Sequence, residues 1–570
     1  MKLWIRGFAV LCLLAVLTVP GVRADVEEWA KEQMGVSPQQ LRIDNQREAL
    51  GVEPNADIKA MDITERCSIR VSTGDKSRLT SNSVSKGWSY SSIGDWVSVD
   101  LPSGVTPGAI RIEWRFDPKG YELEEYDADR HTLRTRTEAD TFPGIYTMFA
   151  LLPETRSVRI RMTAKDQVIV RLVLYSEGVL PNNVQTWLPP VEKADMMVFS
   201  THQDDEVIFL GGTIPYSDVV CGRPTVTVYM TNCSRSRRRE ALECLWVMGS
   251  RHYPEFINLK DKRVSSIDEG IRLWGGRDNI LKEMVERIRR YKPEVIVTQD
   301  FNGEYGHNQH RIMARAMPYA IEAAADPTKY PDSYRIYGAW QVKKLYIHLY
   351  KKNEIRMDWL TPQPALGGLT LLKVAQNGME KQASQTKYYS VKDGGKYDNA
   401  RFGLYMTQVG ADVTGGDFFE NIEPDASAKY LAEHPEAEMR ETDLNAQTAS
   451  PADGSDREGS DDVFAPEADT SPEPDEPAEA EDHHNISGKP ERTVDAAPAR
   501  PAGSREKQGS VLPAVAMIGL GLAGIGYGSW RFLSRSGLKH PKRKRRNGTA
   551  GHSTQKARGR QRDGRSRNVI

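Results

Sequence analysis

Two short polar segments of this 570-residue chain carry side-chain types that bind metals and move protons. The first reads Thr201-His-Gln-Asp-Asp-Glu206 and follows an apolar run that ends at Ser200. The second reads Gln299-Asp-Phe-Asn-Gly-Glu-Tyr-Gly-His-Asn-Gln-His310 and follows the strand-like run 293–298. The histidines and carboxylates of these segments are the groups from which catalytic divalent-metal sites are built.

The spacing within each segment suits a metal-dependent hydrolysis. A turn can direct alternate side chains at one point while an intervening carboxylate faces the substrate. His307 and His310 can share one face at the start of a helix that we expect to begin near Arg311. Two neutral imidazoles and one carboxylate are a usual catalytic zinc set, with a position open for water. Either segment alone fits a solvated loop, but together they favour zinc.

The elements around these segments predict an α/β fold. Apolar runs suited to buried strands alternate with helical stretches at about 237–248 and 278–291; the runs are 196–199, 225–230, 295–297 and 345–347. Strand–helix alternation is typical of a Rossmann-like parallel sheet, in which ligands bind at the carboxyl ends of the strands. Both polar segments lie at such ends. A nucleotide-binding domain is disfavoured, because the first of these loops lacks a glycine-rich phosphate cradle.

The same residues carry a family resemblance that covers residues 193–424. His202-Gln-Asp-Asp-Glu206 looks like the H-P-D-D-E motif of the PIG-L/LmbE family, the zinc-dependent N-acetylglucosaminyl de-N-acetylases. Tyr305-Gly-His-Asn-Gln-His310 resembles that family's G-H-P-D-H element. Further similar segments, in family order, are Arg237-x-x-Glu240 with Cys244 and Met248-Gly249, Ala383-Ser-Gln385, and Gly415-Gly-Asp-Phe-Phe-Glu420. The chain departs from the motifs at Gln203 and Asn308, which replace prolines, and at Gln309, which replaces an aspartate.

The resemblance implies a role for several side chains. His202, Asp205 and His310 would bind zinc, which lowers the pKa of its water towards ~7 and polarises the amide carbonyl. Asp204 would be the general base, and His307 would stabilise the oxyanion or protonate the leaving amine.

Two further side chains receive weaker assignments. Tyr305 could turn towards the same oxygen. Arg237 could bind a substrate hydroxyl or phosphate, although the arginine-rich run 235–239 also fits a charged surface.

We therefore expect a hydrolase that removes the N-acetyl group of an N-acetylglucosamine-containing conjugate at the cell surface. Two alternatives remain open: a zinc amidohydrolase with another N-acyl substrate, and a non-catalytic sugar-binding or scaffolding protein. The presence of both Asp204 and His307 argues against a pure binder, which needs no base. The natural substrate cannot be read from the sequence.

A second domain precedes this one. After a polar, partly helical lead-in at 25–60, residues 61–180 contain short alternating runs, which predict an antiparallel, jelly-roll-like β-sandwich. The runs are 67–72, 96–101, 109–114, 158–162 and 168–174. Its aromatic residues could stack on sugars, although ordinary packing explains them better; they are Trp88, Tyr90, Tyr121 and Tyr126.

The two ends of the chain predict export and a membrane anchor. Residues 1–24 have the charged start, apolar run and small residues of a cleaved signal peptide. The acidic, Pro-rich segment 425–510 is predicted to be a disordered stalk, and the uncharged segment 511–530 a transmembrane helix. The tail 531–570 is strongly basic. After a span, this charge indicates a cytoplasmic end rather than nucleic-acid binding. The folded domains would lie outside the cell, and the oligomeric state is undetermined.

Overall fold

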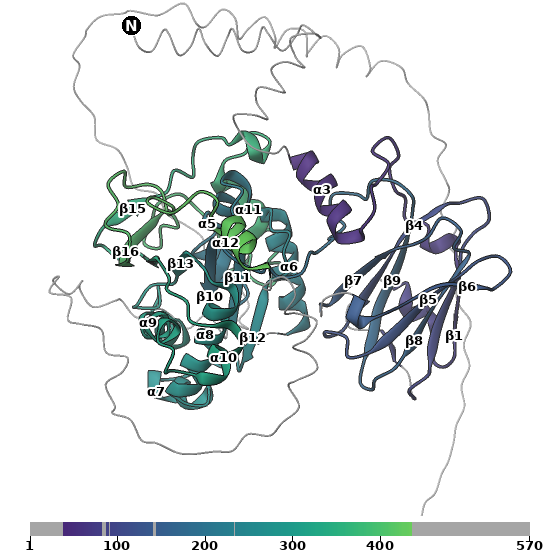
Figure 1. Ribbon diagram of the computed structural model, residues 1–570, viewed down its shortest axis with the longest axis horizontal. Coiled ribbons are helices and arrows are strands. Elements are labelled where there is room, and N and C mark those ends of the chain that lie inside the picture. Colours follow the sequence, from purple (N-terminus) through teal and green to yellow (C-terminus); the bar gives the residue numbers. More distant parts are fainter. Residues whose placement is uncertain (1–37, 82–86, 90–91, 141–143, 233, 436–570) are drawn as a thin grey trace, which may run out of the picture. The chain divides into compact units, whose positions relative to one another are not determined.

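The computed structural model describes residues 38–435 apart from 82–86, 90–91, 141–143 and 233. This part contains an N-terminal helix, an all-β domain and an α/β domain (Figure 1). Helix α3 (Pro38–Leu50) lies in the predicted lead-in, and its buried Gln46 exchanges hydrogen bonds with the backbone of Leu180. The lead-in is therefore packed against the segment that joins the two domains.

The all-β domain is a sandwich of two antiparallel sheets, with the strand orders β1-β3-β8-β5-β6 and β2-β9-β4-β7. The strands are β1 (Ser68–Val71), β2 (Trp88–Ser89), β3 (Trp96–Asp100), β4 (Pro107–Trp114), β5 (Tyr121–Tyr126), β6 (Thr132–Thr137), β7 (Tyr146–Ala150), β8 (Ser157–Met162) and β9 (Val168–Ser176). Short 3₁₀ turns are η1 (Thr64–Arg66), η2 (Lys76–Leu79) and η3 (Glu138–Asp140). Each predicted alternating run forms one strand. On β8, for example, Ile160 is buried between the more exposed Arg159 and Arg161.

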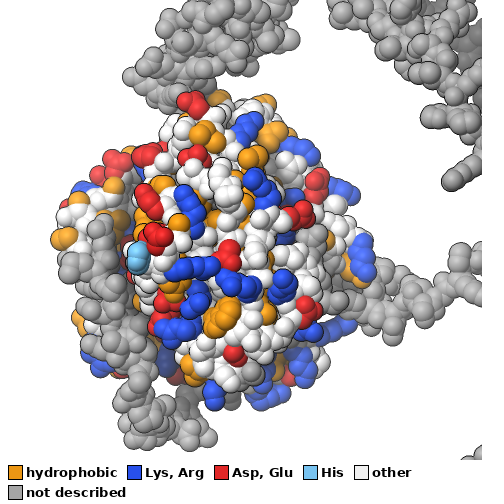
Figure 2. Space-filling view, turned by 90° about the vertical axis from the view of Figure 1, so that its right-hand side faces the viewer, with side chains coloured by type: hydrophobic (Ala, Val, Ile, Leu, Met, Phe, Trp, Pro, Cys, Tyr) orange, Lys and Arg blue, Asp and Glu red, His pale blue; other side chains and the backbone are white. Residues whose placement is uncertain are grey.

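Aromatic side chains of the sandwich serve mainly its core. Trp88 and Tyr121 are 1% and 0% exposed, so neither is available to stack on a sugar. Tyr126 lies on the surface of its sheet beside the Arg159 guanidinium, and Tyr90 lies outside the described residues. The side of the molecule seen in Figure 2 carries mixed acidic and basic side chains, with hydrophobic ones in small separate areas. The sandwich therefore has the polar outside that its alternating runs predict.

The α/β domain is built on a seven-stranded sheet with the order β12-β11-β10-β13-β14-β16-β15. The strands are β10 (Met196–Ser200), β11 (Thr225–Thr231), β12 (Glu255–Leu259), β13 (Val295–Thr298), β14 (Lys344–His348), β15 (Glu354–Arg356) and β16 (Arg401–Thr407). Strands β12, β11, β10, β13 and β14 are parallel, but β16 pairs antiparallel with β14 and β15. The predicted all-parallel sheet is thus wrong at one edge. Strands β15 and β16 were missed because they are short or begin with charged residues, unlike buried apolar runs.

Helices cover both faces of this sheet (Figure 1). They are α4 (Asp205–Ile208), α5 (Thr213–Pro215), the π-turn η4 (Tyr216–Val220), α6 (Arg235–Met248), α7 (Ile267–Leu273), α8 (Arg277–Tyr291), α9 (Asn308–Ala325), α10 (Pro331–Tyr337), η5 (Pro364–Leu366), α11 (Leu371–Met379) and α12 (Ala426–Glu433). Met196 and Val198 enter the core with α4, α6 and α11, whereas Met197 and Phe199 enter the core with α7, α8 and α9. Because both faces are buried, the central strands are apolar throughout.

The predicted ends of the chain fall largely outside the described residues. These include the signal peptide at 1–24, the span at 511–530 and the tail at 531–570. Within the described ranges, none of the helices has the length and apolar character needed to cross a bilayer. The predicted start of the stalk at 425 is wrong, because α12 lies there and its buried Ser427 hydrogen bonds to Asp195. The folded domain therefore extends to the end of α12.

Candidate active site

The loop after β10 is a buried turn that leads directly into α4. The backbone N–H of His202 donates to Asp205 Oδ2 at 2.8 Å, which folds the turn back on itself. Asp204 immediately precedes the first residue of α4. Gln203, which stands where the motif has proline, is fully buried and donates to the carbonyl of Thr231 at the end of β11. This hydrogen bond ties the turn to the neighbouring strand without a proline.

The loop after β13 presents the second set of side chains. Helix α9 begins at Asn308, three residues before the predicted start, so His307 is the N-cap residue and His310 lies in the first turn. Gly303 has a φ of 70°, and a Cβ there would lie 2.6 Å from the carbonyl oxygen of His307. A glycine is therefore required for the loop to bring His307 close to β13.

Three lone-pair atoms from these loops meet at one point. His202 Nδ1 lies 3.0 Å from Asp205 Oδ2 and 3.0 Å from His310 Nε2. His310 Nε2 lies 3.1 Å from Asp205 Oδ2, which closes a nearly equilateral triangle. Atoms that share one ion at about 2.1 Å have spacings of this order. Two imidazoles and a carboxylate, all buried, therefore fit a divalent metal.

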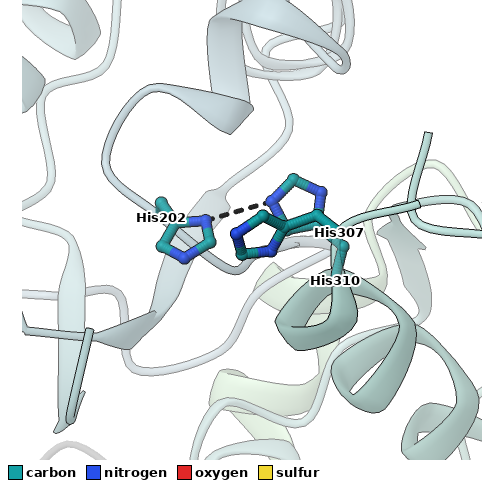
Figure 3. A group of neighbouring side chains, drawn as sticks. All are labelled: His202, His307 and His310. Carbon is teal, nitrogen blue, oxygen red and sulfur yellow. Dashed lines mark hydrogen bonds between the residues drawn. The ribbon is translucent and has the colours of Figure 1, made fainter. Parts of the chain in front are cut away.

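His307 stands beside this donor triangle (Figure 3). Its ring nitrogens and those of His202 and His310 include atoms within 4.8 Å of one another. The His307 Nδ1 atom is buried and has no hydrogen-bond partner in the described part of the chain. The structure thus offers His307 either as a further ligand or as a free imidazole. We assign it the second role, because Asp205 completes the triangle at shorter distances.

Arg237 does not point freely at a substrate. Its Nη2 atom lies 2.6 Å from Asp204 Oδ1 and forms an ion pair with it. Gln385, with its amide nitrogen turned to Asp204, donates to Oδ2 at 3.3 Å and accepts from Arg237 Nη1. The predicted substrate contact is therefore replaced, in this state, by contacts that hold the predicted general base.

The surroundings give the two neighbouring aspartates, Asp204 and Asp205, opposite shifts in pKa. Burial and, to a smaller extent, the neighbouring Asp205 raise the pKa of Asp204 to about 6, although Arg237 opposes the rise. Burial also acts to raise the pKa of Asp205, but His310 and His202 outweigh it and hold that pKa well below its usual range. Asp205 is thus the permanently ionised member, as a metal ligand must be, and Asp204 is poised to exchange a proton.

His310 and His307 also have opposite shifts in pKa. Burial lowers the pKa of His310, but the carboxylates of Asp205 and Glu304 outweigh burial and raise the pKa to about 10. Burial and, to a smaller extent, the neighbouring His310 and His202 lower the pKa of His307 to about 3. His307 is therefore a neutral imidazole with one N–H to donate.

Tyr305 lies at the mouth of the site. Its side chain is 43% exposed, and its ring centroid lies 5.7 Å from those of both His307 and His310. Its hydroxyl pairs with that of Tyr389, and burial raises the pKa of Tyr305. Tyr305 is thus a protonated hydroxyl group beside the two histidines.

The sequence analysis missed several residues of the site. Glu304 contacts His310, and His348 contacts Glu304 from the end of β14. Glu304 lies in the loop after β13 and His348 is the last residue of β14, so the rule about carboxyl ends of strands could have found them. Tyr389 and Gln385 come from the segment after α11. Gln385 belongs to a family-like segment that received no role in the sequence analysis, and only the tertiary structure shows that both side chains lie near the site.

Comparison with known proteins gives one family match and partial relatives. Residues 197–321 match the family model described as PIG-L, GlcNAc-PI de-N-acetylase. A 1D-myo-inositol 2-acetamido-2-deoxy-alpha-D-glucopyranoside deacetylase of Geodermatophilus obscurus is 40% identical over 80 residues, which are 14% of this chain and 26% of the relative. A mycothiol S-conjugate amidase of Streptomyces coelicolor is 34% identical over 122 residues, 20% of this chain and 40% of the relative. The chain thus spans well under two thirds of these curated relatives.

One solved structure adds a distant likeness. The N,N'-diacetylchitobiose deacetylase from Pyrococcus horikoshii, complexed with an inhibitor, has 18% identity and a TM-score of 0.26. The match covers 34% of this chain and 72% of that one. The matched family segment 197–321 runs from β10 to α9 and includes both loops that form the donor triangle.

Proposed function

The chain belongs to the PIG-L family through residues 197–321, and we propose that it is a zinc-dependent hydrolase that removes the acetyl group from the nitrogen of an N-acetylglucosamine-containing conjugate. The resemblance found in the two polar segments is thereby confirmed at the level of the family. The donor triangle of His202, Asp205 and His310 carries the proposal, because it sits beside a carboxylate that is not part of it.

The donor set supports zinc as the metal. His202 Nδ1, Asp205 Oδ2 and His310 Nε2 would hold the ion, and two imidazoles with one carboxylate are a common catalytic zinc set. A bound zinc ion would polarise the amide carbonyl and lower the pKa of a water molecule. The residues around the triangle must then supply the proton transfers and the binding of charge.

Asp204 is placed to act as the base. Arg237 and Gln385 hold its two oxygens, so the carboxylate cannot turn away as a proton arrives. Asp204 takes a proton from the attacking water, and that proton can pass to the nitrogen that leaves as an amine. A base of this kind usually contributes 10²- to 10⁴-fold to the rate.

His307 and Tyr305 are placed to meet the negative charge that develops on the carbonyl oxygen. Both are neutral donors beside the triangle, and His307 Nδ1 is not engaged by another described residue. A preorganised donor that is released from other hydrogen bonds is most effective when charge appears only in the transition state.

The proposal is tested with the purified full-length protein loaded with zinc. We expect release of acetate and a new free amine from N-acetylglucosamine oligosaccharides or N-acetylglucosaminyl-inositol, followed by mass spectrometry. The Asp204→Asn protein, with zinc still bound, is the matched control. If the zinc-loaded wild type released no acetate from any N-acetylated sugar in such a panel, the proposed function would be wrong.

An amidase with a larger acyl group is the second candidate. A relative of the chain over 122 residues is the mycothiol S-conjugate amidase from Streptomyces coelicolor, which favours amide hydrolysis over any one acyl group. A series of glucosamines with acetyl, propionyl and bulky N-acyl groups separates the two. A preference for the bulky amides would favour the amidase.

We also propose that the enzyme works outside the cell, tethered to the membrane. The apolar segment 511–530, the basic tail 531–570 and the signal-like start 1–24 support this proposal from the sequence alone. The substrate would then be a glycan or glycoconjugate of the envelope or of its surroundings.

A further inference from the structure

A second layer of side chains lies behind the donor triangle. His202 and His310 each turn one ring nitrogen to the triangle and the other towards a buried polar side chain. Gln309 Oε1 lies 3.0 Å from His202 Nε2, and Glu304 Oε2 lies 2.9 Å from His310 Nδ1. We infer that Gln309 and Glu304 are positioning residues that each keep a proton on the far nitrogen of a ligand histidine. This inference rests on the proposed metal site.

The tautomer matters because a neutral imidazole has one N–H and one lone pair. An acceptor at the far nitrogen holds the proton there and leaves the lone pair directed at the triangle. His202 must bind through Nδ1 and His310 through Nε2, so the two rings need opposite tautomers. Two separate acceptors, one beside each ring, stabilise these two different tautomers.

Gln309 is fixed in the required orientation. Its Nε2 atom donates to the carbonyl of Lys260 at 3.0 Å, so its Oε1 atom must face His202. The side chain is fully buried, and the neutral amide adds no charge next to the ring. Asp261 is a second, more distant acceptor, 3.6 Å from His202 Nε2 and 47% exposed at its side chain. Gln309 is therefore the principal partner of His202.

Glu304 is also held, although its backbone is unusual. It has a φ of 53°, a conformation that is uncommon for residues other than glycine. Its Oε1 atom accepts from the backbone N–H of Asp300 at 2.9 Å and lies 3.3 Å from His348 Nδ1. Its Oε2 atom faces His310 Nδ1 at 2.9 Å and also accepts a longer hydrogen bond, of 3.4 Å, from Gln299 Nε2. The buried carboxylate thus links the metal ligand to the end of β14.

A competing contact at His310 does not change this assignment. Gln299 Nε2 also lies 2.9 Å from His310 Nδ1. Because Gln299 Oε1 accepts from the backbone N–H of Thr201, this Nε2 atom is a donor and cannot receive the proton of His310. When His310 Nε2 faces a metal, the proton is on Nδ1, and the acceptor that faces it is Glu304.

The inference is tested by zinc affinity, measured on the full-length protein by competition with a chromophoric chelator. Replacing a partner behind a metal ligand typically lowers metal affinity about 10- to 100-fold. We expect this loss for Gln309→Met, which keeps the length of the side chain but removes the acceptor. Gln309→Glu keeps an acceptor and should retain wild-type affinity within about threefold.

Glu304→Gln tests the other histidine. It keeps the size of the side chain but removes the charge and one acceptor oxygen, and we expect about a 10-fold loss of affinity. Glu294→Gln is the matched control: it removes another buried carboxylate, paired with Lys193 at 2.7 Å, before β13 and thus at the opposite end of that strand. This control should lower the melting temperature without changing zinc affinity.

The outcomes separate the inference from the proposed function. A wild-type protein that binds no zinc would overturn both. A wild-type protein that binds zinc, with Gln309→Met and Glu304→Gln binding equally well, would overturn the inference alone. If Glu304→Gln did not fold, the comparison of Gln309→Met with Gln309→Glu would still decide, because only loss of the acceptor should weaken binding.

Discussion

At the scale of single residues, the two adjacent carboxylates of the site, Asp204 and Asp205, have different partners. Asp205 faces two imidazoles at 3.0 and 3.1 Å, and Asp204 faces a guanidinium at 2.6 Å. The turn between β10 and α4 separates their directions, so neighbours in sequence reach different partners. The same turn places His202 and Asp205 on one side and leaves Asp204 facing Arg237 and Gln385.

Substitution of these aspartates should therefore have different effects. Asp204→Asn should retain zinc, because the triangle is untouched, and should lose about 100-fold or more in kcat, the usual scale for a missing general base. Asp205→Asn should weaken zinc binding, with activity partly restored by added zinc. Zinc content and rate are measured on the same samples. Loss of metal from Asp204→Asn alone would require the two roles to be exchanged.

His307 gives a separate prediction. His307→Ala should keep the zinc bound by the other three side chains but lower kcat by about 100-fold, since its proposed hydrogen bond forms only with developing charge. KM should change little. A protein that lost its zinc on this substitution would show that His307 is a ligand, as its position in the histidine group of Figure 3 also permits.

At the scale of elements, α6 links the site to the sandwich. The arginine-rich start of this helix is not only a charged surface: Arg237 pairs with Asp204, while Arg238 and Arg239 pair with Asp117 and Glu113 of the sandwich, each at 2.9 Å. The hydrophobic core continues across this junction, because Tyr146 of β7 packs in the same cluster as α6. The sandwich thus helps to hold the helix that orients the base.

Of the two ion pairs between α6 and the sandwich, the one at the buried Glu113 should contribute more to the free energy of unfolding. Glu113 is 2% exposed and pairs with Arg111 as well as Arg239. Glu113→Gln leaves two partly buried guanidinium groups without their carboxylate, and we expect a loss of about 3 kcal/mol in the free energy of unfolding. Asp332→Asn breaks an ion pair whose side chains are both 76% exposed, and it should change stability by less than about 0.5 kcal/mol. Denaturant unfolding compares them, and equal effects would contradict the prediction.

The segment between α5 and β11 gives an element-scale prediction about pH. Burial raises the pKa of Asp218 from 3.8 to about 7, although Ser250, which donates to it at 3.0 Å, and Arg251 oppose the rise. A carboxyl with a raised folded-state pKa contributes stability that is complete below its unfolded pKa and is lost as pH rises through about 7. Asp218→Asn should flatten the fall in melting temperature between about pH 4 and 7. An unchanged slope would show that Asp218 is ionised in the folded state.

At the scale of the whole molecule, the proposed topology can be tested in cells. A tag after Ile570 should resist an impermeant labelling reagent on intact cells and react after permeabilisation. The same tag moved to a surface loop of the α/β domain, such as the one at Gly394 and Gly395, serves as the control and should react on intact cells. Labelling of the C-terminal tag on intact cells would contradict a cytoplasmic tail.

The sequence by itself determined the types of layer, the order of the elements and the residues of the triangle. Alternating runs, apolar strands and the loops at their ends are local features of the sequence. They can be recognised because burial of one or both faces of a sheet requires apolar residues at a regular spacing. His202, Asp205 and His310 could be named before any distance was known because the resemblance to the PIG-L/LmbE motifs implies them. The strands β15 and β16 carry no such signal. β15 is a three-residue edge strand, and β16, which lies between β14 and β15, begins with Arg401 and is only partly buried in its second half.

The tertiary structure alone decided the partners of those residues. Arg237 meets Asp204, Glu304 meets His310, and Gln385 approaches from the segment after α11, at sequence separations from 6 to more than 100 residues. Long polar side chains find partners through the packing of several elements, and a residue's type limits but does not select them. Which ring nitrogen of each histidine faces the triangle, and which neighbour lies at its other nitrogen, is therefore a property of the fold.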